Sequence, residues 1–390
     1  MNSKYGFFQI APIMLAFFIM GYCDLIGVAS NYVKQDFNLS DTSANFYSTM
    51  LFLWFLILSV PTGIIMNRIG KKNTVLISMF ITLLGLIFPY ILYTQIGMVI
   101  AFSLIGIGNT LIQVSLNPLV AGMVEPKKQA SVLTLGQFIK AIASFLAPII
   151  ATQAFMHFGD WKLLFVTFAI VDALTIVGLA TTKVQEEEKL DGRCTTILQC
   201  LKLLGNSTIV FLFVGILMHV GIDVGINITA PKLLQEKTGM TLANAAYATS
   251  VYFLLRTIGC FAGSFIMSRF SPAKFYIISV LLILIGILGL LFTKEALLIY
   301  LCVGLIGIGN SNIFSVLFSS ALRYEPGRND EVSGLMIMGI SGGAVIPVVM
   351  GVSSDSTGGQ IGAVIVLLVC VVYLVLLAVR ISRLERGFAR

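Results

Sequence analysis

Charged side chains are scarce in this chain. Only 11% of its 390 residues are Asp, Glu, Lys or Arg, less than half the share of about 25% in a typical soluble domain. Hydrophobic residues make up 57%, and the mean hydropathy is +0.97. A membrane-spanning helix needs about 20 mostly apolar residues. The chain therefore has room for about twelve such helices with short loops, and none for a soluble catalytic domain.

Residues for metal, redox or nucleophilic chemistry are also few. The six cysteines are scattered, mostly in apolar segments, and have no zinc or redox spacing, so we interpret them as small buried hydrophobic residues. Gly106-Ile-Gly108 lies inside an apolar span with no strand before it, which excludes a phosphate-binding loop. We predict no metal, no cofactor and no enzymatic activity.

The apolar segment 7–20 could be a secretory signal. It lacks a small-residue cleavage site and further spans follow directly, so we interpret it as the first helix of an all-α membrane protein. The predicted spans are 7–29, 44–66, 74–94, 97–123, 130–155, 162–182, 207–230, 243–268, 273–292, 295–323, 330–353 and 359–382.

Basic residues show a strong sidedness. With the N-terminus inside, eighteen Lys and Arg residues fall on the cytoplasmic side and five on the outer side. This bias predicts two cytoplasmic termini in a bacterial inner membrane. The net charge of +7 then reflects topology and gives no indication of a nucleic-acid partner.

The sequence repeats itself. Leu104-Ile-Gly-Ile-Gly-Asn109 recurs as Leu305-Ile-Gly-Ile-Gly-Asn310, and Ile65-Met66 recurs as Ile266-Met267, both at an offset of 201 residues. We predict two pseudo-symmetric six-helix bundles, 1–182 and 207–390, in the major facilitator architecture, joined by a solvated cytoplasmic linker, 183–206. Such proteins bind substrate near the midplane, between the halves.

Four ionisable residues fall well within the predicted spans: Asp24, Lys140, Asp223 and Arg256. A charge inside a membrane costs about 2.5–3.5 kcal/mol on insertion scales, so each one suggests a function. Asp24 and Asp223 lie 199 residues apart, at equivalent places in the two halves. We predict that Asp24, and secondarily Asp223, couples transport to protons. The alternative is that the four charges form structural ion pairs.

Uncharged amides form a second polar layer in the same spans. Amides bind sugar hydroxyls through both donors and acceptors, but they also hold membrane helices together. Trp54, Tyr47 and Tyr252 could stack on a sugar ring, although such aromatics are more often packing residues. His219, one turn from Asp223, is a lesser candidate for proton handling. The amides are Gln113, Asn117, Gln137, Asn227, Asn310 and Asn312.

Several segments resemble a known family. Gly63-Ile-Ile-Met-Asn-Arg-Ile-Gly-Lys-Lys72 resembles the major facilitator loop signature, in which Gly63, Arg68 and Gly70, with Arg269 in the second half, would control conformation. The segments 113–119, 310–322 and 339–351 are similar to the fucose permease and bacterial glucose/galactose transporter branch. The resemblance implies sugar uptake by proton symport, with Asp24 at the family's acidic coupling position in the first helix.

The chain departs from this branch in ways that alter the cavity charge. Gln113 replaces a glutamate of the fourth helix, and Lys140 and Arg256 are added cations. Because Arg and Lys are natural partners of a carboxylate, these changes favour an acidic sugar, sialic or hexuronic, bound by Lys140, Arg256 and the amides. A neutral hexose remains the alternative, since Asp24 and Asp223 could neutralise both cations; a small-molecule exporter is a further one. We predict a monomer and leave the coupling ion, proton or sodium, open.

Overall fold

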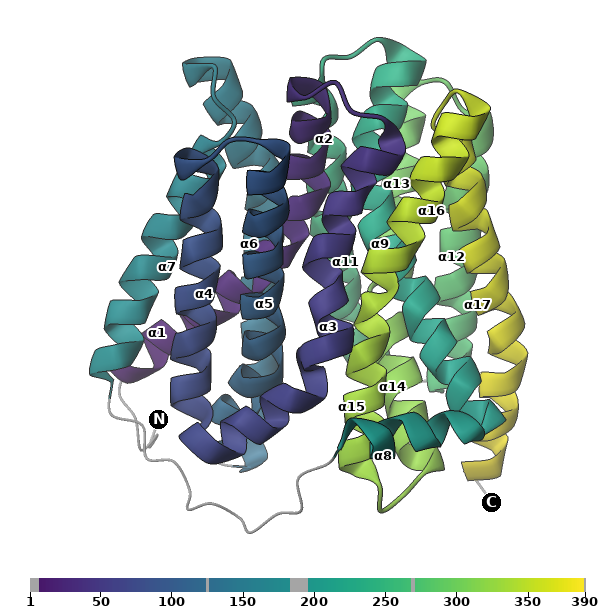
Figure 1. Ribbon diagram of the computed structural model, residues 1–390. Coiled ribbons are helices and arrows are strands. Elements are labelled where there is room, and N and C mark those ends of the chain that lie inside the picture. Colours follow the sequence, from purple (N-terminus) through teal and green to yellow (C-terminus); the bar gives the residue numbers. More distant parts are fainter. Residues whose placement is uncertain (1–6, 124–125, 183–195, 268–270, 389–390) are drawn as a thin grey trace.

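The computed structural model describes residues 7–123, 126–182, 196–267 and 271–388, and these ranges are almost entirely helical (Figure 1). Twelve helical segments are long and apolar enough to cross a membrane. In the first half they are α1 (Phe7–Met20), η1 (Gly21–Leu25) and α2 (Ile26–Asp36), which together form one span, then α3 (Asp41–Ile69), α4 (Lys71–Ile91), α5 (Gln95–Met123), α6 (Pro126–Phe158) and α7 (Leu163–Thr181).

The second half repeats this plan with more interruptions. Its elements are α8 (Ile197–Lys202), η2 (Leu203–Gly205), α9 (Ser207–Thr238), α10 (Leu242–Ala245), α11 (Tyr247–Met267), α12 (Pro272–Phe292), α13 (Ala296–Asn310), α14 (Ile313–Tyr324), α15 (Asn329–Met338), η3 (Gly339–Ser341), α16 (Gly342–Thr357) and α17 (Ile361–Phe388).

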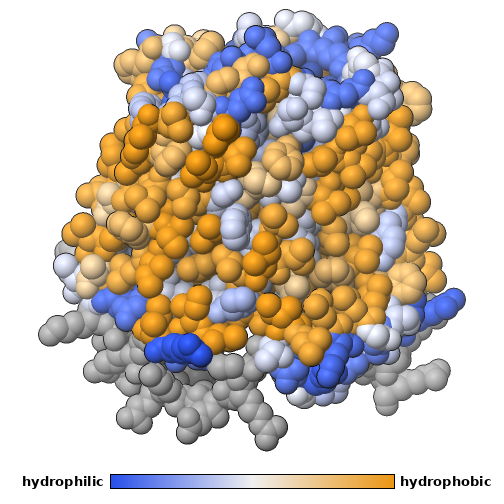
Figure 2. Space-filling model, in the orientation of Figure 1, coloured by the Kyte–Doolittle hydropathy of each residue, from blue (hydrophilic) through white to orange (hydrophobic). Residues whose placement is uncertain are grey.

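The face of the molecule seen in Figure 2 is apolar between two polar ends. Figure 2 shows a broad apolar surface with polar side chains above and below it. The start of α1 and the end of α17 lie at the same end of the molecule (Figure 1), as an even number of spans requires. These features describe a multi-pass membrane protein, and the predicted twelve-span fold is confirmed.

Two predicted spans were too short at one end. The first continues to Asp36 instead of 29, and the seventh to Thr238 instead of 230. Both extensions contain polar residues, including Lys34 and Lys232, two of the five basic residues predicted to lie on the outer side. Their helices continue because these lysines form ion pairs within the protein.

The described part of the predicted linker contains a short helix. Residues 183–195 lie outside the described part of the chain, but α8 begins inside the predicted range. Thr196 and Gln199 form a capping box that starts this helix, and α8 packs against α15. The segment from 197 to 205 is therefore helical, with Cys200 and Leu203 buried and most of its other side chains exposed.

The repeated Gly-Ile-Gly-Asn motif makes equivalent close contacts in both halves. A Cβ atom on Gly106 would lie 2.2 Å from the carbonyl oxygen of Leu51 in α3, and one on Gly307 would lie 2.6 Å from that of Tyr252 in α11. Only glycine allows the helix backbones to approach so closely. The internal repeat of the sequence is therefore a repeat of helix packing.

The two halves meet mainly where α2 packs on α9, α3 on α16, and α6 on α11. Three spans are interrupted near their middle, at η1, at Ser311–Asn312 and at η3. Short non-α segments inside helices often mark functional hinges, and η1 carries Asp24.

Candidate substrate and proton site between the two halves

Asp24 is positioned by a close approach of the first span to α6. A Cβ atom on Gly21 would lie 2.5 Å from the carbonyl oxygen of Lys140, so only glycine fits there. One turn further along α6, the Ser144 hydroxyl donates to Asp24 Oδ2 at 2.6 Å, and the Cys23 thiol lies 3.5 Å from Oδ1. Both partners are neutral, and Asp24 forms no ion pair within the described residues.

Lys140 faces the same cavity without a bonded partner. In the part of the chain that the structure describes, its ammonium forms neither a hydrogen bond nor an ion pair. The cavity, of about 120 Å³, lies between the first span, α6 and α11, and so between the two halves. Its lining combines the charged residues with apolar ones: Asp24, Gln137, Phe138, Lys140, Ala141, Ser144, Phe253, Arg256, Thr257, Cys260 and Phe261.

Asp223, on α9, has a charged partner. Arg256 Nη1 lies 3.1 Å from its Oδ2, and the Tyr252 hydroxyl donates to its Oδ1. Asn310 Nδ2 donates to the Tyr252 oxygen at 2.9 Å, and His219 Nδ1 lies 2.7 Å from Asn310 Oδ1. Because that oxygen can only accept, His219 Nδ1 is the donor.

This chain of hydrogen bonds has one direction. Each donor points towards the next acceptor, from His219 through Asn310 and Tyr252 to the Asp223 carboxylate. Hydrogen bonds to a charged acceptor are the stronger kind, and an ion pair adds to them. The arrangement therefore stabilises Asp223 as an anion and holds Arg256 beside it.

The two acidic residues approach each other across the interface between the halves. Asp24 and Asp223 both line a very small cavity, together with Ile26, Gly27, Val224 and Asn227. A Cβ atom on Gly27 would lie 2.9 Å from Cβ of Asn227, so α2 and α9 are in close contact there. The structure thus brings the four predicted charges into one region, where two positive and two negative charges balance.

The predicted amides are divided between the cavity and the packing around it. Gln137 lines the main cavity, and Asn227 lines the small one while donating to the Asp223 carbonyl oxygen at 2.6 Å. Gln113 instead donates to Asn109, which donates in turn to the Met20 carbonyl oxygen at the start of η1. These two amides support the helix break that carries Asp24.

The other three amides do not line the main cavity. Asn117 lies one turn beyond Gln113 on α5, and its buried Oδ1 has no hydrogen-bond partner in the described residues. Asn310 is fully buried in the chain of bonds to Asp223. Asn312 donates to the Gly259 carbonyl oxygen at 2.9 Å, where it connects the interrupted tenth span to α11.

The predicted loop signature lies far from this cavity. Gly70 separates α3 from α4 with a φ of 91°, a left-handed conformation that favours glycine. Gly63 is partly buried, and a Cβ atom added to it would meet no other atom within 4 Å. Arg68 is exposed, and Arg269 lies outside the described residues.

The three predicted aromatics have different surroundings. Tyr252 bonds to Asp223, as described above. Tyr47 packs against Phe102, with 5.6 Å between the ring centroids, and Trp54 is partly buried. None of the three lines the main cavity.

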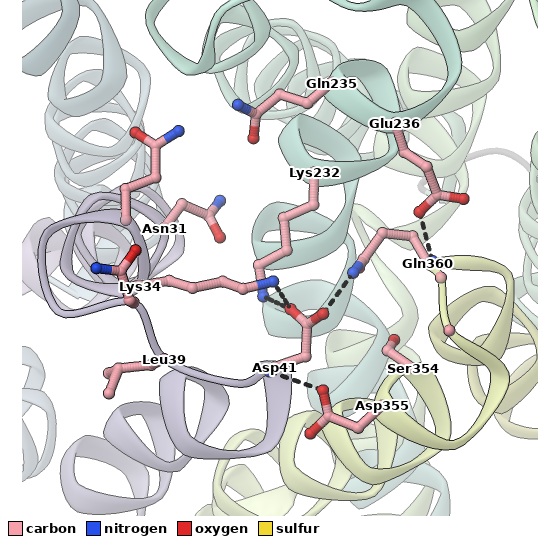
Figure 3. A pocket seen from close by; sticks show the side chains of 14 residues that line it. Asn31, Lys34, Leu39, Asp41, Lys232, Gln235, Glu236, Ser354, Asp355 and Gln360 are labelled. Atoms are coloured by element: carbon pink, nitrogen blue, oxygen red, sulfur yellow. Dashed lines mark hydrogen bonds and ion pairs between the residues drawn. The ribbon is translucent and has the colours of Figure 1, made fainter.

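Sequence reasoning missed a second charged cluster, at the end of the molecule that we predict to be outside. Figure 3 shows Asp41, at the start of α3, surrounded by partners. Its Oδ1 accepts from Lys34 at 2.8 Å and from Lys232 at 2.7 Å, and its Oδ2 accepts from Gln360 at 2.9 Å. Lys232 also donates to Asn45 at 3.0 Å. Lys232 and Gln360 belong to the second half, so the cluster joins the two bundles.

A further contact across the halves strengthens this end. The Asp355 carboxylate accepts from the backbone amides of Asp41 and Thr42, both at 2.9 Å, and so caps the N-terminus of α3 from α16. Above the cluster lies a polar recess of about 780 Å³ (Figure 3). The polar extensions of the first and seventh spans were the signal in the sequence, and the predicted boundaries stopped short of them.

Asp172 is another membrane carboxylate that the sequence reasoning omitted, although it lies in the predicted sixth span. It is fully buried in α7, and neither carboxylate oxygen has a hydrogen-bond partner in the described residues. It does not line the cavity between the halves.

Comparison with known proteins identifies the family. The family model of the Major Facilitator Superfamily matches residues 12–346 and 211–389. The "Glucose/galactose transporter" of Brucella abortus (strain 2308) is 24% identical over 96% of this chain and 93% of its own length. The "Probable nitrate transporter NarT" of Staphylococcus aureus (strain Newman) is 26% identical over 92% of each chain.

Solved structures share the fold. The nucleoside transporter NupG superimposes with a TM-score of 0.78 at 13% identity, over 97% of this chain and 99% of that one. The fucose:proton symporter of E. coli gives a TM-score of 0.63 at 18% identity, over 96% and 99%. The family match, the twelve spans and the shared fold agree, and this chain belongs to the Major Facilitator Superfamily of membrane transporters.

Proposed function

We propose that this transporter imports a monosaccharide together with protons across the bacterial inner membrane, as a monomer with both termini in the cytoplasm. The observation that carries the proposal is the pair of unpaired charges in the central cavity, Asp24 and Lys140. Asp24 sits in a helix break between the halves, where rearrangement of the bundles can change its surroundings. The names of the glucose/galactose and fucose:proton relatives support the sugar and the proton.

The charge balance of the cavity suggests how the proton and the substrate are coupled. Asp24 and Asp223 contribute two negative charges, Lys140 and Arg256 two positive ones. A proton on Asp24 leaves the Lys140 charge without compensation, whereas Arg256 keeps its partner, Asp223. Substrate oxygens that bind Lys140 would restore the balance, so proton and substrate favour each other's binding.

Whether the sugar is acidic or neutral depends on which substrate group binds the Lys140 ammonium. An acidic sugar would bring a carboxylate to the Lys140 ammonium. Because α5 has the uncharged Gln113, it offers no carboxylate of its own that would compete for Lys140. A neutral hexose would bind through Gln137 and the Lys140 donors, and the names of the glucose/galactose relatives favour this alternative. The ion pair with Asp223 makes Arg256 a weaker anchor for an anion than its charge alone suggests.

An inorganic anion is the second candidate substrate. A relative named as a probable nitrate transporter covers nearly the whole chain, and an unpaired lysine in a small cavity would suit such an ion. The polar amides around Asp24 favour the sugar. Export of small molecules is a further alternative, which the direction of gradient-driven transport would test.

Transport by this route requires the outer contacts to separate. The cavity of about 120 Å³ is smaller than the roughly 300–1,000 Å³ typical of ligand pockets. The Asp41–Lys232 cluster and the Asp355 cap join the halves at the predicted outer end. We infer that these contacts break when the cavity opens outward and reform when it opens inward, as alternating access requires.

The test is uptake into liposomes that contain the purified protein under an inward proton gradient. The labelled substrates would be glucose, galactose, fucose, glucuronate, sialic acid and nitrate. Gradient-driven uptake of any of the five sugars supports the proposal, and Lys140→Gln should then impair an acidic sugar much more than a neutral one. The exposed Lys294→Gln is the matched control. Uptake of nitrate alone, or gradient-driven efflux, would contradict the proposal.

A further inference from the structure

We propose that a groove between α9, α14 and α17 binds an anionic phospholipid. The groove has a volume of about 790 Å³ and lies apart from both the central cavity and the outer cluster. It combines an apolar wall with two arginines, and no carboxylate lines it. The lining residues that carry the argument are Phe211, Tyr373, Leu376, Val379, Arg380 and Arg383.

The length of α17 places these arginines at the membrane surface. The helix begins at Ile361, near the predicted outer surface, and an α-helix rises about 1.5 Å per residue. Arg380 is therefore about 29 Å further along and Arg383 about 33 Å, against a hydrocarbon thickness of about 30 Å. Both guanidinium groups lie at the level of the lipid head groups, on the predicted cytoplasmic side.

Arg380 is held in place for an anion. Its guanidinium stacks over the Phe211 ring at 4.1 Å, and its Nη2 donates to the Ser207 hydroxyl at 3.2 Å. These contacts use one face and one donor, so other donors remain for a phosphate. Arg383, one turn further along α17, is exposed. Two neighbouring guanidinium groups match a phosphodiester, which arginine binds in bidentate fashion.

The nearby carboxylates are occupied elsewhere. Glu385 accepts from the Ser271 hydroxyl at 2.6 Å and from the Ala273 amide at 3.1 Å, both at the start of α12. Glu325 accepts from Asn206 at 3.2 Å. Neither lines the groove, so its charge is positive.

The apolar wall suits an acyl chain. Leu376 and Val379 are 68% and 57% exposed, and Phe211 is 39% exposed, so they form a hydrophobic surface that runs from the arginines towards the membrane interior. The Tyr373 hydroxyl, which donates to the Phe211 carbonyl oxygen at 3.0 Å, marks the inner end of this wall. Basic pockets between membrane helices on the cytoplasmic side typically bind anionic head groups. A free anion would use the arginines but not the wall.

The test is a thermal-unfolding titration of the full-length protein in detergent after removal of native lipid. Dioctanoyl phosphatidylglycerol should stabilise the protein at lower concentrations than dioctanoyl phosphatidylcholine. The variant Arg380→Gln/Arg383→Gln should raise the half-saturating concentration roughly tenfold or more, since each interfacial arginine contributes about 1 kcal/mol to binding anionic lipid. Lys274→Gln, an exposed basic residue at the start of α12, should bind like the unmodified protein.

Arg383→Gln alone tests the proposal if the double variant fails to fold, because Arg383 is exposed; it should still weaken binding several-fold. Equal stabilisation by both lipids would overturn the proposal, as would unchanged binding by the arginine variants. Equal stabilisation by inorganic phosphate would show a plain anion site and would overturn the lipid assignment.

Discussion

Asp24 and Asp223 each lie in the first span of a half, and their surroundings differ. Asp223 lies within the continuous helix α9, is 8% exposed, and has an arginine and a tyrosine hydroxyl on its carboxylate. Asp24 lies in the break η1 and is more exposed, and within the described residues its carboxylate has only a serine hydroxyl and a cysteine thiol as hydrogen-bond partners. Lys140, the cation of the first half, remains apart from it.

The difference supports our proposal that the two carboxylates have different roles. Protonating Asp223 would break an ion pair and leave the partly buried Arg256 without its counter-ion, which is costly. Protonating Asp24 loses no ion pair. We propose that the neighbouring side chains decide which of the two acidic residues exchanges a proton with the substrate site.

The largest expected effect comes from Asp24→Asn. Without a carboxylate in η1, the variant should lose sugar accumulation driven by a proton gradient, down to the level of empty liposomes. Exchange of labelled for unlabelled sugar should continue, because it needs no net proton movement. Asp160→Asn, which alters a carboxylate in an outer loop, should accumulate sugar normally. Normal accumulation by Asp24→Asn would remove the distinction between the two acidic residues.

Arg256→Gln should cause the largest loss of stability. It leaves the Asp223 carboxylate buried without a counter-ion, and breaking such a pair costs about 3–5 kcal/mol. Thermal unfolding in detergent measures the change. The double variant Asp223→Asn/Arg256→Gln should recover most of the loss, because neither charge then remains alone. If the single variant were as stable as the unmodified protein, Asp223 would be no better paired than Asp24.

Tyr252→Phe should have a smaller effect on stability. It removes a hydrogen bond to a charged acceptor, worth about 1.5–3 kcal/mol, and leaves Asn310 Nδ2 without its partner. Tyr22→Phe is the matched variant in the first half, where the hydroxyl donates to the neutral Phe168 carbonyl oxygen at 3.0 Å. Equal losses in thermal unfolding would show that the Asp223 carboxylate gains no special stabilisation from Tyr252.

The smallest expected effect comes from removing a lysine partner of Asp41, a third acidic residue to compare with Asp24 and Asp223. Lys232→Gln removes the partner in the other half and should shift the molecule towards its outward-open form. Maleimide labelling of Thr49→Cys, at a contact between the halves, should then speed up roughly tenfold, a change of about 1.4 kcal/mol. Lys34→Gln, which removes the partner in the same half, should leave the rate nearly unchanged. Equal rates for the two variants would show that the cluster does not hold the halves together.

Much of the fold could be predicted from the sequence, because hydropathy and an exact internal repeat are local properties. The Gly-Ile-Gly-Asn repeat predicted two equivalent halves, and its glycines make equivalent helix contacts. The four charges that the sequence singled out do meet between the halves. Burial in a membrane is expensive for each of them, so their presence alone was a strong signal.

The pairing among those charges could not be predicted. Whether Arg256 reaches Asp223 while Lys140 stays apart from Asp24 depends on side-chain distances across helices. The two asparagines that end the repeat have identical sequence surroundings but different hydrogen-bond partners, which the sequence could not predict. Asn109 donates to the Met20 carbonyl oxygen beside η1, whereas Asn310 donates to the Tyr252 hydroxyl. Hydropathy windows also end where polar residues begin, which is why the Asp41 cluster was missed.

The central claim is that Asp24 takes up the coupled proton while Asp223 stays ionised beside Arg256. Infrared difference spectroscopy tests it directly, because the carboxyl carbonyl band appears only when a carboxylate is protonated. Acidification of the purified protein should produce a band that is absent from Asp24→Asn and retained in Asp223→Asn. Asp172→Asn serves as the control for the buried carboxylate of α7. A band that persists in Asp24→Asn and disappears in Asp223→Asn would contradict the account.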